Sequence, residues 1–171
     1  MSNASLPTEP LRAEHRDLLP HLQGLATVAD EVDRWDADEA AQVLGRIVGF
    51  LRGHLIPHAR AEEQVLYPAI EEAMDAPGAT ATMRADHAEI ISRIDRLADT
   101  AATVATQWPD RAVARDLIHQ LIGLSAIVLL HFRKEEEVLL PVLDNTLGPD
   151  DAAALFARMG EEAHPSSSSP S

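Results

Sequence analysis

His58-Ala-Arg-Ala-Glu-Glu-Gln-Val-Leu-Tyr-Pro-Ala-Ile-Glu, residues 58–71, recurs as His131-Phe-Arg-Lys-Glu-Glu-Glu-Val-Leu-Leu-Pro-Val-Leu-Asp, residues 131–144. The histidine, arginine, both glutamates, valine, leucine and proline are identical at matching positions. Upstream, residues 11–19 match residues 83–91, with a histidine at the centre of each stretch. His87 follows His15 by 72 residues, and His131 follows His58 by 73. The chain therefore contains a duplicated unit, which predicts a pseudo-twofold fold.

The residues around these stretches are typical of helices. Apolar side chains recur at helical spacing, and no segment alternates like a half-buried strand. We expect four long amphipathic helices, at about residues 10–33, 36–74, 79–106 and 110–145, and a short fifth helix at 150–159. Short connections favour an all-α, antiparallel up-down-up-down four-helix bundle over residues 8–146. Residues 147–160 would hold the short C-terminal helix, and residues 161–171 would form a disordered tail. Kinks are expected at the prolines within or near the long helices, Pro20, Pro57, Pro68 and Pro141.

Composition excludes several kinds of site. The 171 residues include no cysteine, so a metal must be bound by His, Asp, Glu or the single tyrosine, Tyr67. The formal net charge of −14 disfavours binding to nucleic acid or to an anionic membrane. The N-terminus lacks a signal-peptide pattern, and the longest nearly apolar run, Leu121–Phe132, is too short to span a bilayer. We expect a soluble cytoplasmic protein.

Two histidine–glutamate pairs carry the predicted chemistry. Residues four apart share one face of a helix, so His58 points with Glu62, and His131 points with Glu135. Both pairs lie in an apolar stripe, where an unpaired carboxylate is costly to bury. With a histidine from each of the other two helices, they would place four imidazoles and two carboxylates around the bundle axis, as in metal sites of bundle cores. The six candidate ligands are His15, His58, Glu62, His87, His131 and Glu135.

The number of ligands favours two ions over one. A closed structural zinc site needs only four. Two six-coordinate ions offer about 12 positions, of which bridging carboxylates, four histidines and an oxo or hydroxo bridge would leave about two open. These open positions suit a small ligand such as oxygen, nitric oxide or peroxide. Imidazole and carboxylate ligands suit iron, manganese or zinc.

Neighbouring residues extend this set. His54 lies one turn before His58 and is matched by Ile127 in the repeat. It is either a fifth imidazole ligand, a hydrogen-bonding partner of the site, or a partly exposed surface residue. Glu63 and Glu136 are turned about 100° from the paired glutamates, which favours a place outside the ligand set or in solvent.

With this ligand order, the chain resembles the hemerythrin-like (HHE cation-binding) family over Leu11–Asn145. The resemblance implies a non-haem di-iron centre in a four-helix bundle, with Glu62 and Glu135 bridging two iron ions. It also implies that His15 and His58 bind one iron, and that His87 and His131 bind the other. Oxygen-carrying hemerythrins have a further histidine where this chain has Met83 and an aspartate where it has Glu136. The resemblance therefore does not imply reversible oxygen transport.

Three functions are consistent with these features. The first is an iron protein that binds a small ligand for sensing, storage or stress response. The second is a di-iron oxidoreductase that decomposes peroxide or oxidises ferrous iron. The third is a structural bundle without metal, which the duplicated ligand set disfavours. The oligomeric state is not predicted.

Overall fold

Four long helical stretches make up most of the structure, a computed structural model that describes residues 6–108 and 110–164, without the side chains of 105–107. The first is α1 (Glu9–Ala29), and the third is α5 (Ala81–Gln107). The second joins α2 (Ala37–Phe50), α3 (Ile56–Ala61) and α4 (Tyr67–Ala73) through two π-helical turns, η2 (Leu51–Leu55) and η3 (Glu62–Leu66). The fourth joins α6 (Arg111–Lys134) to α7 (Leu140–Thr146) through the π-helical turn η4 (Glu135–Leu139). The described residues include no strand, so the predicted all-α class is confirmed.

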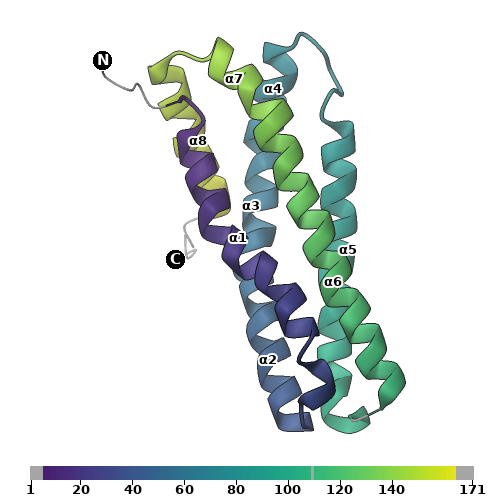
Figure 1. Ribbon diagram of the computed structural model, residues 1–171. Coiled ribbons are helices and arrows are strands. Elements are labelled where there is room, and N and C mark those ends of the chain that lie inside the picture. The colour runs from purple at the N-terminus through teal and green to yellow at the C-terminus, as the bar shows by residue number, and fades with distance from the viewer. Residues whose placement is uncertain (1–5, 109, 165–171) are drawn as a thin grey trace, which may run out of the picture.

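The long stretches lie side by side along one axis (Figure 1). A short 3₁₀ turn, η1 (Val32–Arg34), follows α1, and α8 (Pro149–Ala163) packs against α3 and η3. Side-chain caps mark two helix starts. Asp36 accepts a hydrogen bond from the Glu39 amide before α2, and Asp110 accepts one from the Ala112 amide before α6.

The apolar core is divided into two clusters. One contains the second half of α1 together with most of α6, and includes Leu22 and Leu121. The other lies around η3, α4 and α7, and includes Leu66 and Leu140. Each helix stretch passes from one cluster to the other, and the buried histidines and glutamates lie at the passage. A polar layer therefore separates the two halves of the core.

Three of the expected proline kinks take the form of π-helical turns. Pro57, Pro68 and Pro141 each occupy the second residue after η2, η3 or η4, and the helix continues through all three. Proline cannot donate to the carbonyl four residues earlier and crowds it, so a turn widened by one residue accommodates the ring. Pro20 lies inside α1 without an interruption of the helix.

The C-terminal region differs from the prediction. We expected the last helix to end at Met159, but α8 continues to Ala163 and so includes the first residues of the predicted disordered tail. Leu155 and Met159 of α8 are buried in the second core cluster, which anchors the helix. The rest of the predicted tail, residues 165–171, lies outside the described residues.

One helical stretch of the described chain, Arg111–Thr146, is long and apolar enough to cross a membrane by length and composition alone. The face that carries Leu117, Leu121 and Leu124 is buried in the bundle core. Core packing accounts for this apolar face, whereas Ile122 and Leu130 of the same stretch are exposed.

Candidate metal centre

The polar layer contains six buried side chains from all four helix stretches. None of them is more than 2% exposed. α1, α3, α5 and α6 each contribute one histidine, while Glu62 and Glu135 are the first residues of η3 and η4. Their candidate ligand atoms form two groups, each within 4.8 Å. The first group contains His15, His58, Glu62 and Glu135, and the second contains Glu62, His87, His131 and Glu135.

Both glutamates face both groups. Glu62 Oε1 lies 3.0 Å from His58 Nε2, whereas Glu62 Oε2 lies 3.3 Å from His87 Nε2. Glu135 Oε2 lies 3.5 Å from His15 Nε2, and Glu135 Oε1 lies 3.4 Å from His131 Nε2. Each carboxylate thus directs one oxygen to each group, as a carboxylate bridge between two cations requires.

In each of the four polar-layer histidines, the outward-facing nitrogen lies beside a further carboxylate. Three Nδ1 atoms are hydrogen-bonded at 3.0–3.2 Å, and that of His58 is 3.0 Å from Glu14 without an aligned hydrogen bond. A carboxylate on Nδ1 orients the ring, so that Nε2 points its lone pair inward. The pairs are Glu136 with His15, Glu14 with His58, Glu63 with His87, and Asp86 with His131.

These outer carboxylates follow the repeat. Glu14 and Asp86 are 72 residues apart, and Glu63 and Glu136 are 73 apart. The sequence suggested a place outside the ligand set for Glu63 and Glu136 but assigned no role to Glu14 or Asp86. The sequence nevertheless contains a feature that identifies Glu14 and Asp86, because an acidic residue directly precedes the matching histidine in both copies.

His54 does not reach the polar layer. Its side chain is exposed, and its ring lies 5.0 Å from that of Phe50. Leu51 and Leu55 occupy the buried face of η2, and His54 is roughly a quarter of a turn from Leu55. His54, predicted as a possible fifth ligand, therefore lies outside the polar layer, and the surface alternative describes its position.

Several inward-facing atoms have no hydrogen-bond partner in the described structure. They are His15 Nε2, His58 Nε2, both carboxylate oxygens of Glu62, and Glu135 Oε2. Burying such groups without partners is costly, and for an ionised carboxylate the cost is large. All are nitrogen or oxygen donors directed at common points, so a bound cation would satisfy them together. The residues present fit a metal centre.

Electrostatics couple His58 to its carboxylate neighbours. Burial by itself lowers the pKa of His58, but the charge of Glu62 and the contacts with Glu14 and Glu62 outweigh it and hold that pKa well above its ordinary value. Burial conversely raises the pKa of Glu62, yet His58, His15 and His87 outweigh it and hold that pKa well below its usual range. The metal-free centre therefore contains a buried ion pair that a cation must reorganise.

Two aromatic residues complete the surroundings. The Tyr67 hydroxyl donates a hydrogen bond to Glu135 Oε1 at 2.8 Å and lies 3.2 Å from His87 Nε2. Burial, followed by the charges of Glu62 and Glu135, raises the pKa of Tyr67. Phe132 stacks on the His15 ring, with the ring centres 4.1 Å apart. The sequence identified Tyr67 only as a possible oxygen donor and did not indicate Phe132.

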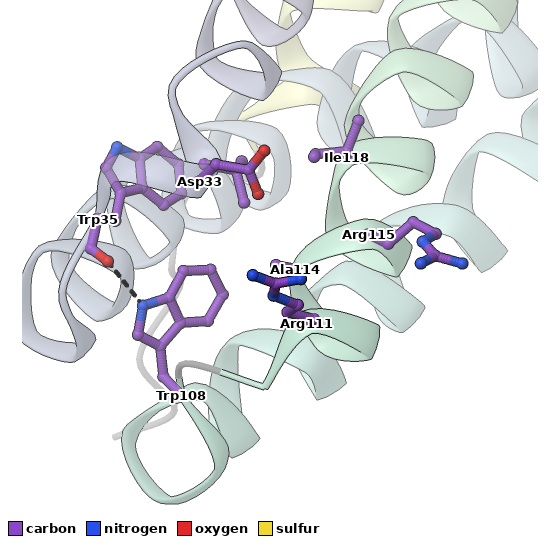
Figure 2. A pocket seen from close by; sticks show the side chains of 8 residues that line it. Asp33, Trp35, Trp108, Arg111, Ala114, Arg115 and Ile118 are labelled. Atoms are coloured by element: carbon purple, nitrogen blue, oxygen red, sulfur yellow. Dashed lines mark hydrogen bonds between the residues drawn. The ribbon is translucent and has the colours of Figure 1, made fainter.

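A cavity of about 660 Å³ lies elsewhere, between η1 and the start of α6 (Figure 2). Trp35 and Trp108 line it at matching positions of the repeat, and Trp108 Nε1 donates to the Trp35 carbonyl at 2.9 Å. Arg111 and Arg115 line its other side, and none of the six polar-layer residues reaches it. Cavity size therefore does not identify the candidate site, whereas the buried ligand atoms do.

Comparison with known proteins agrees with the ligand geometry. The model of the hemerythrin HHE cation binding domain matches residues 6–143. This span includes all six side chains of the polar layer, the four outer carboxylates, and both copies of the repeat except for the last residue of the second. Searches of curated proteins and of solved structures found no match.

Proposed function

Because the chain belongs to the hemerythrin HHE cation-binding family, we propose that its polar layer binds two iron ions in an up-and-down four-helix bundle, together with a small ligand. The ligand class is oxygen, nitric oxide or peroxide, and the role is sensing, storage or stress response. One observation carries this proposal: the two groups of buried donors share Glu62 and Glu135, each of which directs one oxygen to each group.

In this proposal His15 and His58 hold one ion, His87 and His131 hold the other, and the two glutamates bridge them. Iron would supply an open coordination position and a change of oxidation state for the small ligand. The four outer carboxylates keep the imidazole rings oriented. The donor set also accepts manganese or zinc, so the metal is identified by measurement. The acidic surface supports a cytoplasmic protein with a small-molecule partner rather than nucleic acid or membrane.

Anaerobic titration with ferrous iron tests this function. We expect saturation at about two ions per chain, since two donor groups are present. Exposure to air should then produce the absorption band of oxygen-bridged ferric iron. Metal analysis of the purified protein, with spectra before and after reduction, identifies the ion it carries. Saturation at one ion, or no new band in air, contradicts the proposal.

Metal uptake should weaken as the pH falls. The raised pKa of His58 favours its protonated imidazole in the metal-free chain, and a cation must displace that proton. Above this pKa, the protonation of His58 no longer affects the metal affinity. Below it, the affinity falls by about tenfold per pH unit for each displaced proton. Anaerobic ferrous titrations between pH 6 and pH 9 measure the slope.

Glu14→Gln provides the matched control for this prediction. It removes one of the contacts that raise the pKa of His58, so the fall in affinity should begin at a lower pH. Affinity that is independent of pH in the wild-type chain contradicts the prediction.

A further inference from the structure

The two donor groups differ in the partners of their inward-facing atoms. In the first group, His15 Nε2, His58 Nε2 and Glu62 Oε1 have no hydrogen-bond partner in the described structure. In the second group, His87 Nε2 lies 2.9 Å from His131 Nε2 and 3.2 Å from the Tyr67 hydroxyl. That hydroxyl also donates to Glu135 Oε1 at 2.8 Å. In the first group His58 Nε2 is ion-paired with Glu62 Oε1 at 3.0 Å, whereas the second group is closed by the hydrogen bonds of the Tyr67 hydroxyl as well.

A charge difference follows the same division. Lys134, the only lysine in the chain, pairs with Asp86, the outer carboxylate of His131. Glu14 is the counterpart of Asp86 beside His58, and in residues 6–108 and 110–164 no ion pair joins it to a lysine or arginine. Arginines lie beside both groups, because Arg12 is 4.0 Å from Glu136 and its repeat counterpart Arg84 donates to the Glu63 carbonyl. Lys134 adds a positive charge on the side of the second group. It repels an entering cation and neutralises the carboxylate that polarises the His131 ring.

Both differences correspond to differences between the two copies of the repeat. Tyr67 matches Leu140 in the repeat, and Lys134 matches Ala61. The two copies of the repeat carry the same ligand set, but they differ at these two positions. The ligands repeat, whereas the Tyr67 hydroxyl and the Lys134 charge have no counterpart at the first group.

We infer that the two metal positions are unequal and fill in a fixed order, the His15–His58 position first and the His87–His131 position second. This inference rests on the proposed function, because it assumes that both positions bind a cation. An ion entering either position replaces a histidine–glutamate ion pair, that of His58 with Glu62 or that of His131 with Glu135. An ion entering the second position displaces the Tyr67 hydroxyl from Glu135 and from His87.

The difference should be measurable. A hydrogen bond to a charged group contributes about 1.5–3 kcal/mol, which corresponds to about tenfold or more in a dissociation constant. Anaerobic calorimetric titration of the full chain with ferrous iron, at fixed pH, should therefore show two resolved steps. If fewer than two ions bind, the proposed function fails. If two ions bind with indistinguishable constants, only the present inference fails.

Variants of the competing residues test the cause. Lys134→Met and Tyr67→Phe keep the approximate size of the side chain and remove the charge or the hydroxyl, so each should tighten the second step more than the first. Arg133→Met is the matched control, because Arg133 is exposed and pairs only with Glu137 among the described ion pairs. If Tyr67→Phe weakens the second step, the hydroxyl acts as a metal ligand and the inference is overturned.

Variants of the repeat-related histidines test the order. His131→Ala should keep the tight step and lose the weak one, whereas His58→Ala should lose the tight step and bind one ion weakly. A thermal melt of each variant confirms that it is folded, and Lys134→Met remains decisive if one is not. Equal residual affinity in the two histidine variants overturns the assigned order.

Discussion

Glu62→Gln is expected to lose both metal ions. Glutamine preserves the shape of the buried side chain, but it removes the negative charge that both donor groups share. Loss of a partner outside the metal ligands typically lowers metal affinity by about 10–100-fold. Loss of a bridging carboxylate should lower it by more than that for both ions. Metal analysis after purification, followed by ferrous titration, measures the effect.

Two variants calibrate this result. Glu137→Gln alters an exposed glutamate of the same π-helical turn that carries Glu135, so it should leave the metal content unchanged. Glu63→Gln removes the negative charge from the outer partner of His87 and should give an intermediate loss of affinity. If Glu62→Gln retains two tightly bound ions, Glu62 does not bridge them.

Removal of the metal should strongly destabilise the fold. The metal-free polar layer buries carboxylate oxygens and imidazole nitrogens that have no hydrogen-bond partner in the described structure. A ligand at 1,000 times its dissociation constant stabilises the folded state by about 4 kcal/mol. For a chain of this size, one kcal/mol shifts the melting midpoint by about 2–4 °C. Chelation should therefore lower the midpoint by about 10 °C or more.

Thermal melts followed by circular dichroism, before and after anaerobic addition of ferrous iron, measure this shift. Glu62→Gln serves as the control, because its melting midpoint should respond little to iron. Equal midpoints for metal-free and iron-loaded wild-type chains contradict the prediction, since a cation that binds only the folded state must stabilise it.

The helical class and the candidate ligands were predictable because both follow from local spacing. Apolar periodicity identifies helices, and residues four apart share a face in any α-helix. The repeat identified His15 and His87 as matching candidates, although both lie far from the glutamates in sequence. The structure places all six predicted side chains of the ligand set in one buried layer. The exposed position of His54 was not predictable, because the extent of a buried face depends on which neighbours pack against it.

The sequence by itself determined the duplicated ligand pattern, the absence of thiolates and the helical class, since these depend on residue identity and short-range spacing. Only the tertiary structure decided how each carboxylate divides its oxygens between two groups, and which acidic residue faces which imidazole. It also brought Tyr67 and Lys134 to the same one of the two donor groups. These contacts join residues from different helices, and no local periodicity specifies the rotation and depth at which packed helices meet.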